Sequence, residues 1–143
     1  MLLPVTLTLA ALCAFINFWL ALRCGRARMP AKVLHGDGGD PLLVKRMRAH
    51  ANFTEYTPIV LILCALVELA VGASIWLWIA AAVYALARIA HGFGMDADKP
   101  TVWRAGGILI TMVVMLGLAV AALVVAWQAT REVPAPPALA ASV

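Results

Sequence analysis

Four long apolar stretches limit most strongly what this chain can fold into. They lie at about Leu2–Leu22, Pro41–Val71, Ile75–Phe93 and Thr101–Gln128, and a helix needs about 20 residues to cross the hydrocarbon core of a bilayer. With 64% hydrophobic residues and a mean hydropathy of +0.96, the chain is far more apolar than a water-soluble domain. The sequence therefore predicts an all-α, integral membrane four-helix bundle.

By its length the chain is expected to form one domain, residues 1–130, followed by a short tail. From Arg131 onward the sequence holds Pro134, Pro136 and Pro137 among alanines. We therefore expect residues 131–143 to be disordered.

Charge and cysteine usage exclude several classes of function. The formal net charge is +4, but the basic residues flank the apolar stretches and form no patch interleaved with aromatic side chains, which argues against nucleic-acid binding. The cysteines Cys13, Cys24 and Cys64 form no C-x-x-C pair. We expect no disulfide framework and no metal or haem site, because histidine, cysteine and carboxylate residues do not recur at ligand spacing.

The distribution of positive charge predicts the topology. Lysines and arginines concentrate in and around two predicted loops, Arg23–Lys45 and Gly92–Pro100, whereas the turn at Gly72–Ser74 holds none. Because positively charged loops stay in the cytoplasm, both loops are expected inside and both termini outside. We therefore expect a multi-pass protein of a bacterial inner membrane.

Polar residues enter the start of the second stretch on one helical face. At 100° per residue, Arg48, Asn52 and Glu55 lie within about 60° of each other. Charged groups are costly to bury in a bilayer and favour a functional site, although a polar clamp between helices is the alternative. The predicted topology brings Arg88 and Arg104 to the same cytoplasmic end, which strengthens the case for a site.

Three further polar residues lie within or beside apolar stretches. Asn17 is a candidate for an interhelical hydrogen bond. Glu68 lies near the far end of its stretch, where we expect its carboxylate to reach the opposite membrane interface. His91 shares a helical face with Arg88 and is interpreted either as a packing residue or as part of the site.

The side chains of this candidate site favour a small ligand with several charges. Arginines pair with carboxylates through two parallel hydrogen bonds, and Glu55 is suited to an ammonium group. Glutathione carries two carboxylates, one ammonium group and a thiol, and so it fits the three arginines, the amide and the carboxylate.

The second stretch also resembles a known family. The run Arg48-Ala49-His50-Ala51-Asn52-Phe53-Thr54-Glu55-Tyr56-Thr57-Pro58 is similar to the second-helix motif of the MAPEG family, the membrane-associated proteins of eicosanoid and glutathione metabolism. Arg88-Ile89-Ala90-His91 resembles the third-helix motif of that family, and Arg104 has the position of its fourth-helix arginine.

The resemblance implies a homotrimer of four-helix bundles that binds glutathione between neighbouring protomers near the cytoplasmic face. The implied substrate-binding residues are Arg48, Asn52, Glu55, Tyr56, Arg88 and His91. Arg104 resembles the catalytic residue that stabilises the glutathione thiolate, since a nearby cation lowers the pKa of a thiol. The implied partners are glutathione as co-substrate, an apolar small molecule or lipid, and further copies of the chain.

Three positions depart from the pattern of several family enzymes. Met95 stands where they carry a tyrosine, Ala105 stands where some carry a serine, and Ala51 stands where a basic residue is often found. The sequence thus predicts a glutathione transferase or peroxidase that acts on apolar electrophiles or lipid hydroperoxides. The alternative is a non-catalytic lipid-binding or scaffold protein of the same family.

Overall fold

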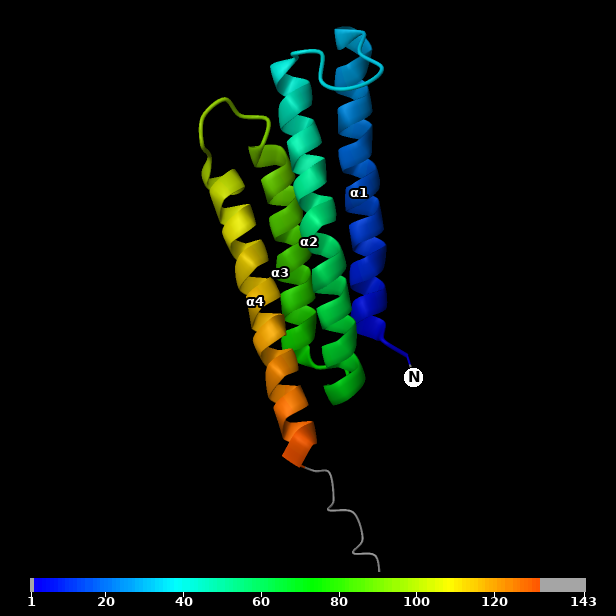
Figure 1. The fold of residues 1–143 in the computed structure, drawn as a ribbon, viewed down its shortest axis with the longest axis vertical. Coiled ribbons are helices and arrows are strands. Elements are labelled where there is room, and N and C mark those ends of the chain that lie inside the picture. Colours follow the sequence, from blue (N-terminus) through cyan, green and yellow to red (C-terminus); the bar gives the residue numbers. More distant parts are fainter. Residues whose placement is uncertain (1, 132–143) are drawn as a thin grey trace, which may run out of the picture.

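The computed structural model describes residues 2–131 and contains four helices within them. They are α1 (Pro4–Ala31), α2 (Pro41–Val71), α3 (Ile75–Gly94) and α4 (Val102–Arg131), which run up and down alternately along the bundle (Figure 1). Each is long and apolar enough to cross a membrane. The prediction of an all-α, multi-pass four-helix bundle is confirmed, whereas the predicted disorder of the tail concerns residues that lie almost entirely outside those described.

The two loops that carry the charged residues, 32–40 and 95–101, lie at the same end of the bundle (Figure 1). The start of α1, the α2–α3 turn and the end of α4 lie at the other. This arrangement agrees with the pairing of loops that the charge pattern predicts. Which end faces the cytoplasm stays a prediction, and we call the end with the two charged loops the cytoplasmic end on that basis.

Local signals in the sequence determine both ends of α2. Asp40 precedes the helix with an extended backbone, and its carboxylate accepts a hydrogen bond from the Leu43 amide at 2.7 Å. Pro41 occupies the first helical position, where its missing N–H costs nothing. Gly72, at φ +77°, ends the helix in a conformation that other residues rarely adopt. The predicted bounds Pro41–Val71 are confirmed.

Helix α1 is longer than predicted. The first apolar stretch ends at Leu22, but the helix continues to Ala31, about 14 Å further at 1.5 Å per residue. The prediction of a loop beginning at Arg23 was therefore wrong. The charged segment stays helical because Arg23 is buried and pairs with the α3–α4 loop, and because Ala27 packs in the interior.

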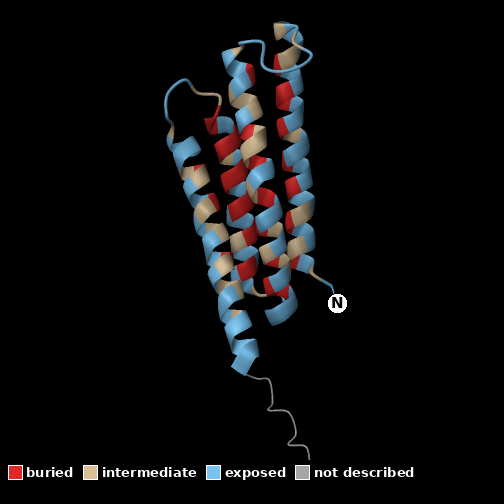
Figure 2. Ribbon diagram, viewed as in Figure 1, coloured by how far each residue is buried: buried red, intermediate tan, exposed pale blue. Residues whose placement is uncertain are grey.

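The core lies between the inner faces of α1, α2 and α3 (Figure 2). It is built mainly from branched aliphatic, aromatic and small side chains, such as Leu9, Ile16, Phe53, Val60, Leu77 and Tyr84. Helix α4 is different, because only Gly107, Thr111 and Leu118 are buried along its whole length. An isolated protomer thus leaves most of α4 facing lipid or another protein.

Helices α1 and α2 are also joined by polar contacts within the bundle. His50 Nε2 lies 2.7 Å from Asn17 Oδ1, which confirms the predicted interhelical hydrogen bond of Asn17. Glu68 differs from its prediction. Its side chain is 1% exposed and is buried within the bundle instead of extending outward from it. It accepts hydrogen bonds from the amides of Val5 at 2.9 Å and Thr6 at 2.8 Å, because the first turn of α1 has no cap of its own.

Candidate functional site

The guanidinium of Arg88 ties three helices together in the half of the bundle nearer the charged loops. It donates hydrogen bonds to Asn52 Oδ1 on α2 at 2.9 Å and to Thr111 Oγ1 on α4 at 3.3 Å. Its carbon centre lies 5.7 Å from the ring centre of Phe53. Arg88 is only 1% exposed, and its Nε atom has no partner among the described residues. The sequence singled out Arg88 and Asn52, but not Thr111 or Phe53.

No carboxylate lies within ion-pair distance of Arg88 in the part of the chain that the structure describes. All of its hydrogen-bond partners are neutral. A buried charge is normally paired, because desolvation without a counter-charge is costly. The site therefore holds an uncompensated positive charge beside the amide of Asn52.

The Asn52 amide has a defined orientation. A carbonyl oxygen that accepts from Arg88 leaves the NH₂ group of the same amide pointing away from Arg88. Asn52 is partly exposed, so this NH₂ group remains available to an acceptor from outside the bundle.

Three charged residues of the candidate site are exposed. Arg48, Glu55 and Arg104 form no hydrogen bond through their side chains and no ion pair with residues 2–131. Arg48 lies one helical turn before Asn52, and Arg104 lies two turns before Thr111 on the same face of α4. Because α2 and α4 run in the same direction (Figure 1), both arginines lie on the cytoplasmic side of the Arg88 contacts.

Glu55 and Tyr56 lie one turn beyond Asn52 in the opposite direction. Glu55 is exposed and Tyr56 is half-buried. Five residues of the candidate site therefore belong to one region of the bundle: Arg48, Asn52, Glu55, Arg88 and Arg104. The one hydrogen bond among their side chains in residues 2–131 is that between Arg88 and Asn52.

His91 is placed differently from the exposed residues. It is buried, and its Nδ1 atom lies 3.0 Å from the backbone carbonyl oxygen of Arg104. Met95 is buried in the apolar core, whereas Ala105 is exposed on α4. The imidazole of His91 is thus directed at the backbone of α4.

A cluster of ion pairs closes the cytoplasmic end of the bundle. Asp96 in the α3–α4 loop accepts from Arg23 of α1 at 2.6 Å and from Arg46 of α2 at 3.1 Å. Arg23 also donates to the carbonyl of Gly92 at 2.7 Å and lies over the Trp19 ring. The sequence does not predict these partners, because an aspartate in a loop gives no signal of which basic residues it meets.

A weaker pair lies beside this cluster. Lys45 contacts Asp98 at 2.6 Å at the surface, and its hydrogen bond lowers the pKa of the Asp98 carboxyl. Together the two aspartates attach the loop that precedes Arg104 to the cytoplasmic ends of α1 and α2.

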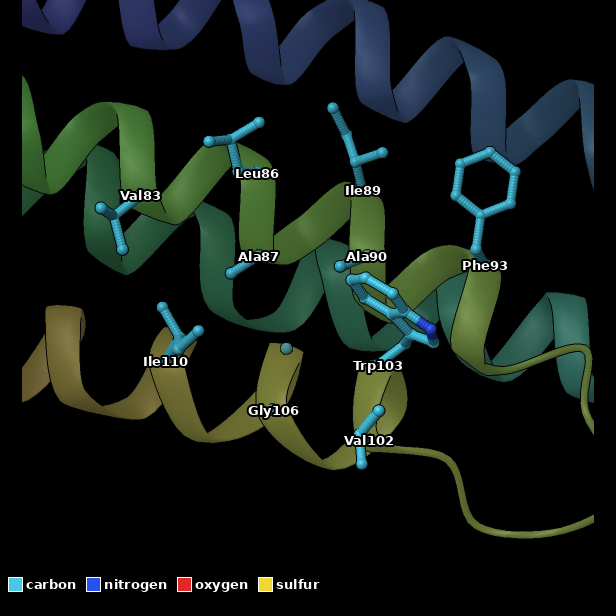
Figure 3. A pocket seen from close by; sticks show the side chains of 11 residues that line it. Val83, Leu86, Ala87, Ile89, Ala90, Phe93, Val102, Trp103, Gly106 and Ile110 are labelled. Carbon is cyan, nitrogen blue, oxygen red and sulfur yellow. The ribbon is translucent and has the colours of Figure 1, made fainter.

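An apolar groove runs between α3 and α4 on the outer surface of the bundle (Figure 3). Its volume is about 830 Å³. Phe93 and Trp103 lie toward one end and Val83 and Ile110 toward the other, while Gly106 contributes no side chain (Figure 3). The groove therefore opens on the outside of the protomer. It begins next to Arg104, since Trp103 is its neighbour in the chain.

Comparison with known proteins agrees with the resemblance seen in the sequence. The MAPEG family model matches residues 6–124, a range that includes every residue of the candidate site. Inner membrane protein YecN of Escherichia coli strain K12 is 32% identical over 108 residues, which cover 75% of this chain and 81% of YecN. YecN of Escherichia coli O6:H1 strain CFT073 matches to the same extent. The chain is therefore a multi-pass membrane protein that belongs to the MAPEG family.

Proposed function

We propose that the protein binds glutathione at the cytoplasmic end of the bundle and activates its thiol towards apolar electrophiles or lipid hydroperoxides. The observation that carries this proposal is the buried guanidinium of Arg88, which has neutral hydrogen-bond partners and no carboxylate among residues 2–131. A carboxylate of glutathione beside Asn52 would supply the missing negative charge. The outward NH₂ group of Asn52 would donate to the same ligand.

The exposed charged residues match the remaining groups of glutathione. Arg48 and Arg104 are suited to carboxylate or thiolate, and Glu55 is suited to the ammonium group. Exposed charges on helices that cross a membrane are expected to be covered by protein or water. A neighbouring copy of the chain provides that cover in the homotrimer that the family resemblance implies, with glutathione bound between protomers.

Arg104 is the proposed catalytic residue. It is the third residue of α4, where the dipole of the helix favours an anion. A cation in this position lowers the pKa of the glutathione thiol and raises the fraction of thiolate, which is the reactive form.

The reaction follows from that thiolate. In a transfer reaction the sulfur forms a bond to an electrophilic carbon, and the leaving group departs with the bonding electron pair. In a peroxidase reaction two glutathione molecules supply two electrons, so that a hydroperoxide becomes an alcohol and water while a glutathione disulfide forms. The groove between α3 and α4 offers an apolar entrance for either substrate.

A matched pair of asparagine variants tests the proposal. Glutathione binding is measured by titration calorimetry on the detergent-solubilised protein. Asn52→Ala is expected to lower the affinity about tenfold or more, because a hydrogen bond to a charged group contributes roughly 1.5–3 kcal/mol. Asn17→Ala removes the same type of side chain from α1, where it contacts His50 of α2, and should leave the affinity unchanged.

Two outcomes would contradict the proposal. One is a wild-type protein that does not bind glutathione at millimolar concentration. The other is an equal loss of affinity in both asparagine variants. A melting curve of each variant without ligand separates loss of binding from loss of folding.

The groove also favours a second candidate function, lipid binding without catalysis. It is apolar along its length and opens on the outside of the protomer, and Met95 and Ala105 depart from the pattern of several family enzymes. Turnover of a chlorodinitrobenzene-type electrophile by the purified protein with glutathione distinguishes the two functions. Glutathione binding without turnover of electrophile or hydroperoxide would favour the scaffold.

A further inference from the structure

The backbone of Arg104 is held from α3, although its side chain is free. His91 Nδ1 lies 3.0 Å from the Arg104 carbonyl oxygen. A carbonyl oxygen only accepts, so Nδ1 of His91 carries the proton and donates it. The ring is buried, and this contact is its one hydrogen bond among the described residues.

Further contacts fix the same short segment of α4. The Arg104 amide donates to Thr101 Oγ1 at 3.2 Å, and that hydroxyl donates to the Gly94 carbonyl at 3.4 Å. A Cβ added to Gly94 would lie 2.9 Å from Arg104 Cα, and one added to Gly107 would lie 2.6 Å from His91 Cβ. The two glycines therefore allow α3 to approach α4 closely on both sides of the hydrogen bond. The first turn of α4 is therefore held in place by α3 and Thr101, while the guanidinium of Arg104 is exposed.

We propose that His91 is a positioning residue for Arg104 and not itself a contact of glutathione. This inference rests on the proposed function and assigns His91 a role that the family resemblance did not imply. The attraction between a cation and a thiolate falls with distance, so a small displacement of the α4 backbone weakens the effect of Arg104 on the thiol. Binding of the glutathione carboxylates and ammonium by other residues should change little.

The two roles of His91 predict different results. A positioning residue changes the pKa of the bound thiol and leaves the affinity for glutathione nearly constant. A ligand contact changes the affinity and leaves that pKa nearly constant. An ultraviolet titration of the thiolate of bound glutathione, combined with calorimetry, measures both quantities in the same detergent-solubilised protein.

His91→Leu removes the donor, whereas His91→Asn keeps an N–H group close to the position of Nδ1. We expect His91→Leu to raise the pKa of the bound thiol by about one unit, which lowers the thiolate fraction about tenfold at pH values well below that pKa. The dissociation constant for glutathione should change less than about threefold, which is well under one tenfold step. His91→Asn should restore most of the wild-type titration.

A second pair of variants moves the same backbone without touching His91. Gly94→Ala introduces a Cβ against the backbone of Trp103 and Arg104, and should raise the pKa of the bound thiol as His91→Leu does. Gly117→Ala on α4 is the matched control, because a Cβ at that position meets nothing within 4 Å. The glycine pair decides the question if His91→Leu does not fold.

The Arg104→Ala titration separates failure of this inference from failure of the proposed function. If Arg104→Ala leaves the pKa of the bound thiol unchanged, the proposed role of Arg104 is wrong, and His91 has nothing to position. If Arg104→Ala raises that pKa but His91→Leu and Gly94→Ala do not, the positioning role is wrong. A tenfold loss of affinity in His91→Leu with an unchanged thiol titration would make His91 a ligand contact.

Discussion

Replacing Glu68 by alanine should detach the first turn of α1 from the bundle. Glu68 lies on α2, yet it does for α1 what an N-cap residue normally does, because Leu3 offers no side-chain cap and Pro4 has no N–H group. The carboxylate accepts from the amides of Val5 and Thr6, and from Thr6 Oγ1 at 2.7 Å. Its negative charge also lies at the positive end of the α1 dipole.

The expected loss of stability follows from these contacts. Alanine leaves the amides of Val5 and Thr6 without an acceptor, and each unsatisfied buried donor costs about 1–3 kcal/mol. The Thr6 hydroxyl can still turn to the Cys64 sulfur, which lies 3.5 Å away. We expect Glu68→Ala to lower the free energy of unfolding by about 2–6 kcal/mol. Glu68→Gln keeps one carbonyl oxygen and should lose about half of that amount.

Two measurements test this prediction. The first is denaturant-induced unfolding in detergent, with Glu55→Ala as the control, because Glu55 is an exposed carboxylate on the same helix with no ion pair among residues 2–131. The second is the rate at which a maleimide modifies Cys64, which is buried beneath Thr6. Fraying of α1 in Glu68→Ala should raise that rate. Equal stability of the Glu68 and Glu55 variants, with an unchanged rate at Cys64, would refute the capping role.

Three further predictions concern the cytoplasmic end. Arg88→Met should abolish the rise in melting temperature that glutathione causes. It should lower the free energy of unfolding of the ligand-free protein by no more than about 1 kcal/mol, because the lost cation had no counter-charge. A preserved rise in melting temperature would contradict the proposed binding site. Asp96→Asn should cost about 2 kcal/mol of stability, since two arginines lose their partner. Asp98→Asn changes a surface residue and should cost far less. Equal losses of unfolding free energy for Asp96→Asn and Asp98→Asn in a denaturant titration would contradict this prediction. A cysteine at His35 should resist an impermeant thiol reagent added outside intact cells, because the 32–40 loop is predicted to be cytoplasmic; efficient labelling there would reverse the topology.

Most of the fold could be predicted because membrane helices are recognised from local properties of the sequence, namely apolar length and capping residues. Apolar length identified all four helices, and Asp40, Pro41 and Gly72 determined the bounds of α2 by capping and turn chemistry. The end of α1 was missed for a physical reason. Charged residues beyond an apolar stretch look like a loop, and the partner that keeps Arg23 helical and buried, Asp96, lies far away in the chain.

The candidate site could be predicted only in part. Helical spacing grouped Arg48, Asn52 and Glu55, and the contact between Asn52 and Arg88 connects that group to α3. Contacts to backbone atoms were not accessible from the sequence. Glu68 binds amides of α1 and His91 binds a carbonyl of α4, and a backbone group looks the same at every residue.

The cluster formed by Arg23, Arg46 and Asp96 has a consequence for how the protein is made. When α1 and α2 enter the membrane, Asp96 has not yet been synthesised. Both arginines are then free positive charges, which by the predicted topology keep their segment in the cytoplasm. After the α3–α4 loop has been synthesised, the same arginines form ion pairs with the carboxylate of Asp96. These pairs join α1, α2 and the α3–α4 loop. Insertion uses only their charge, whereas packing uses the forked geometry of the guanidinium. A lysine at position 23 would therefore preserve orientation in the membrane and still weaken the assembled bundle.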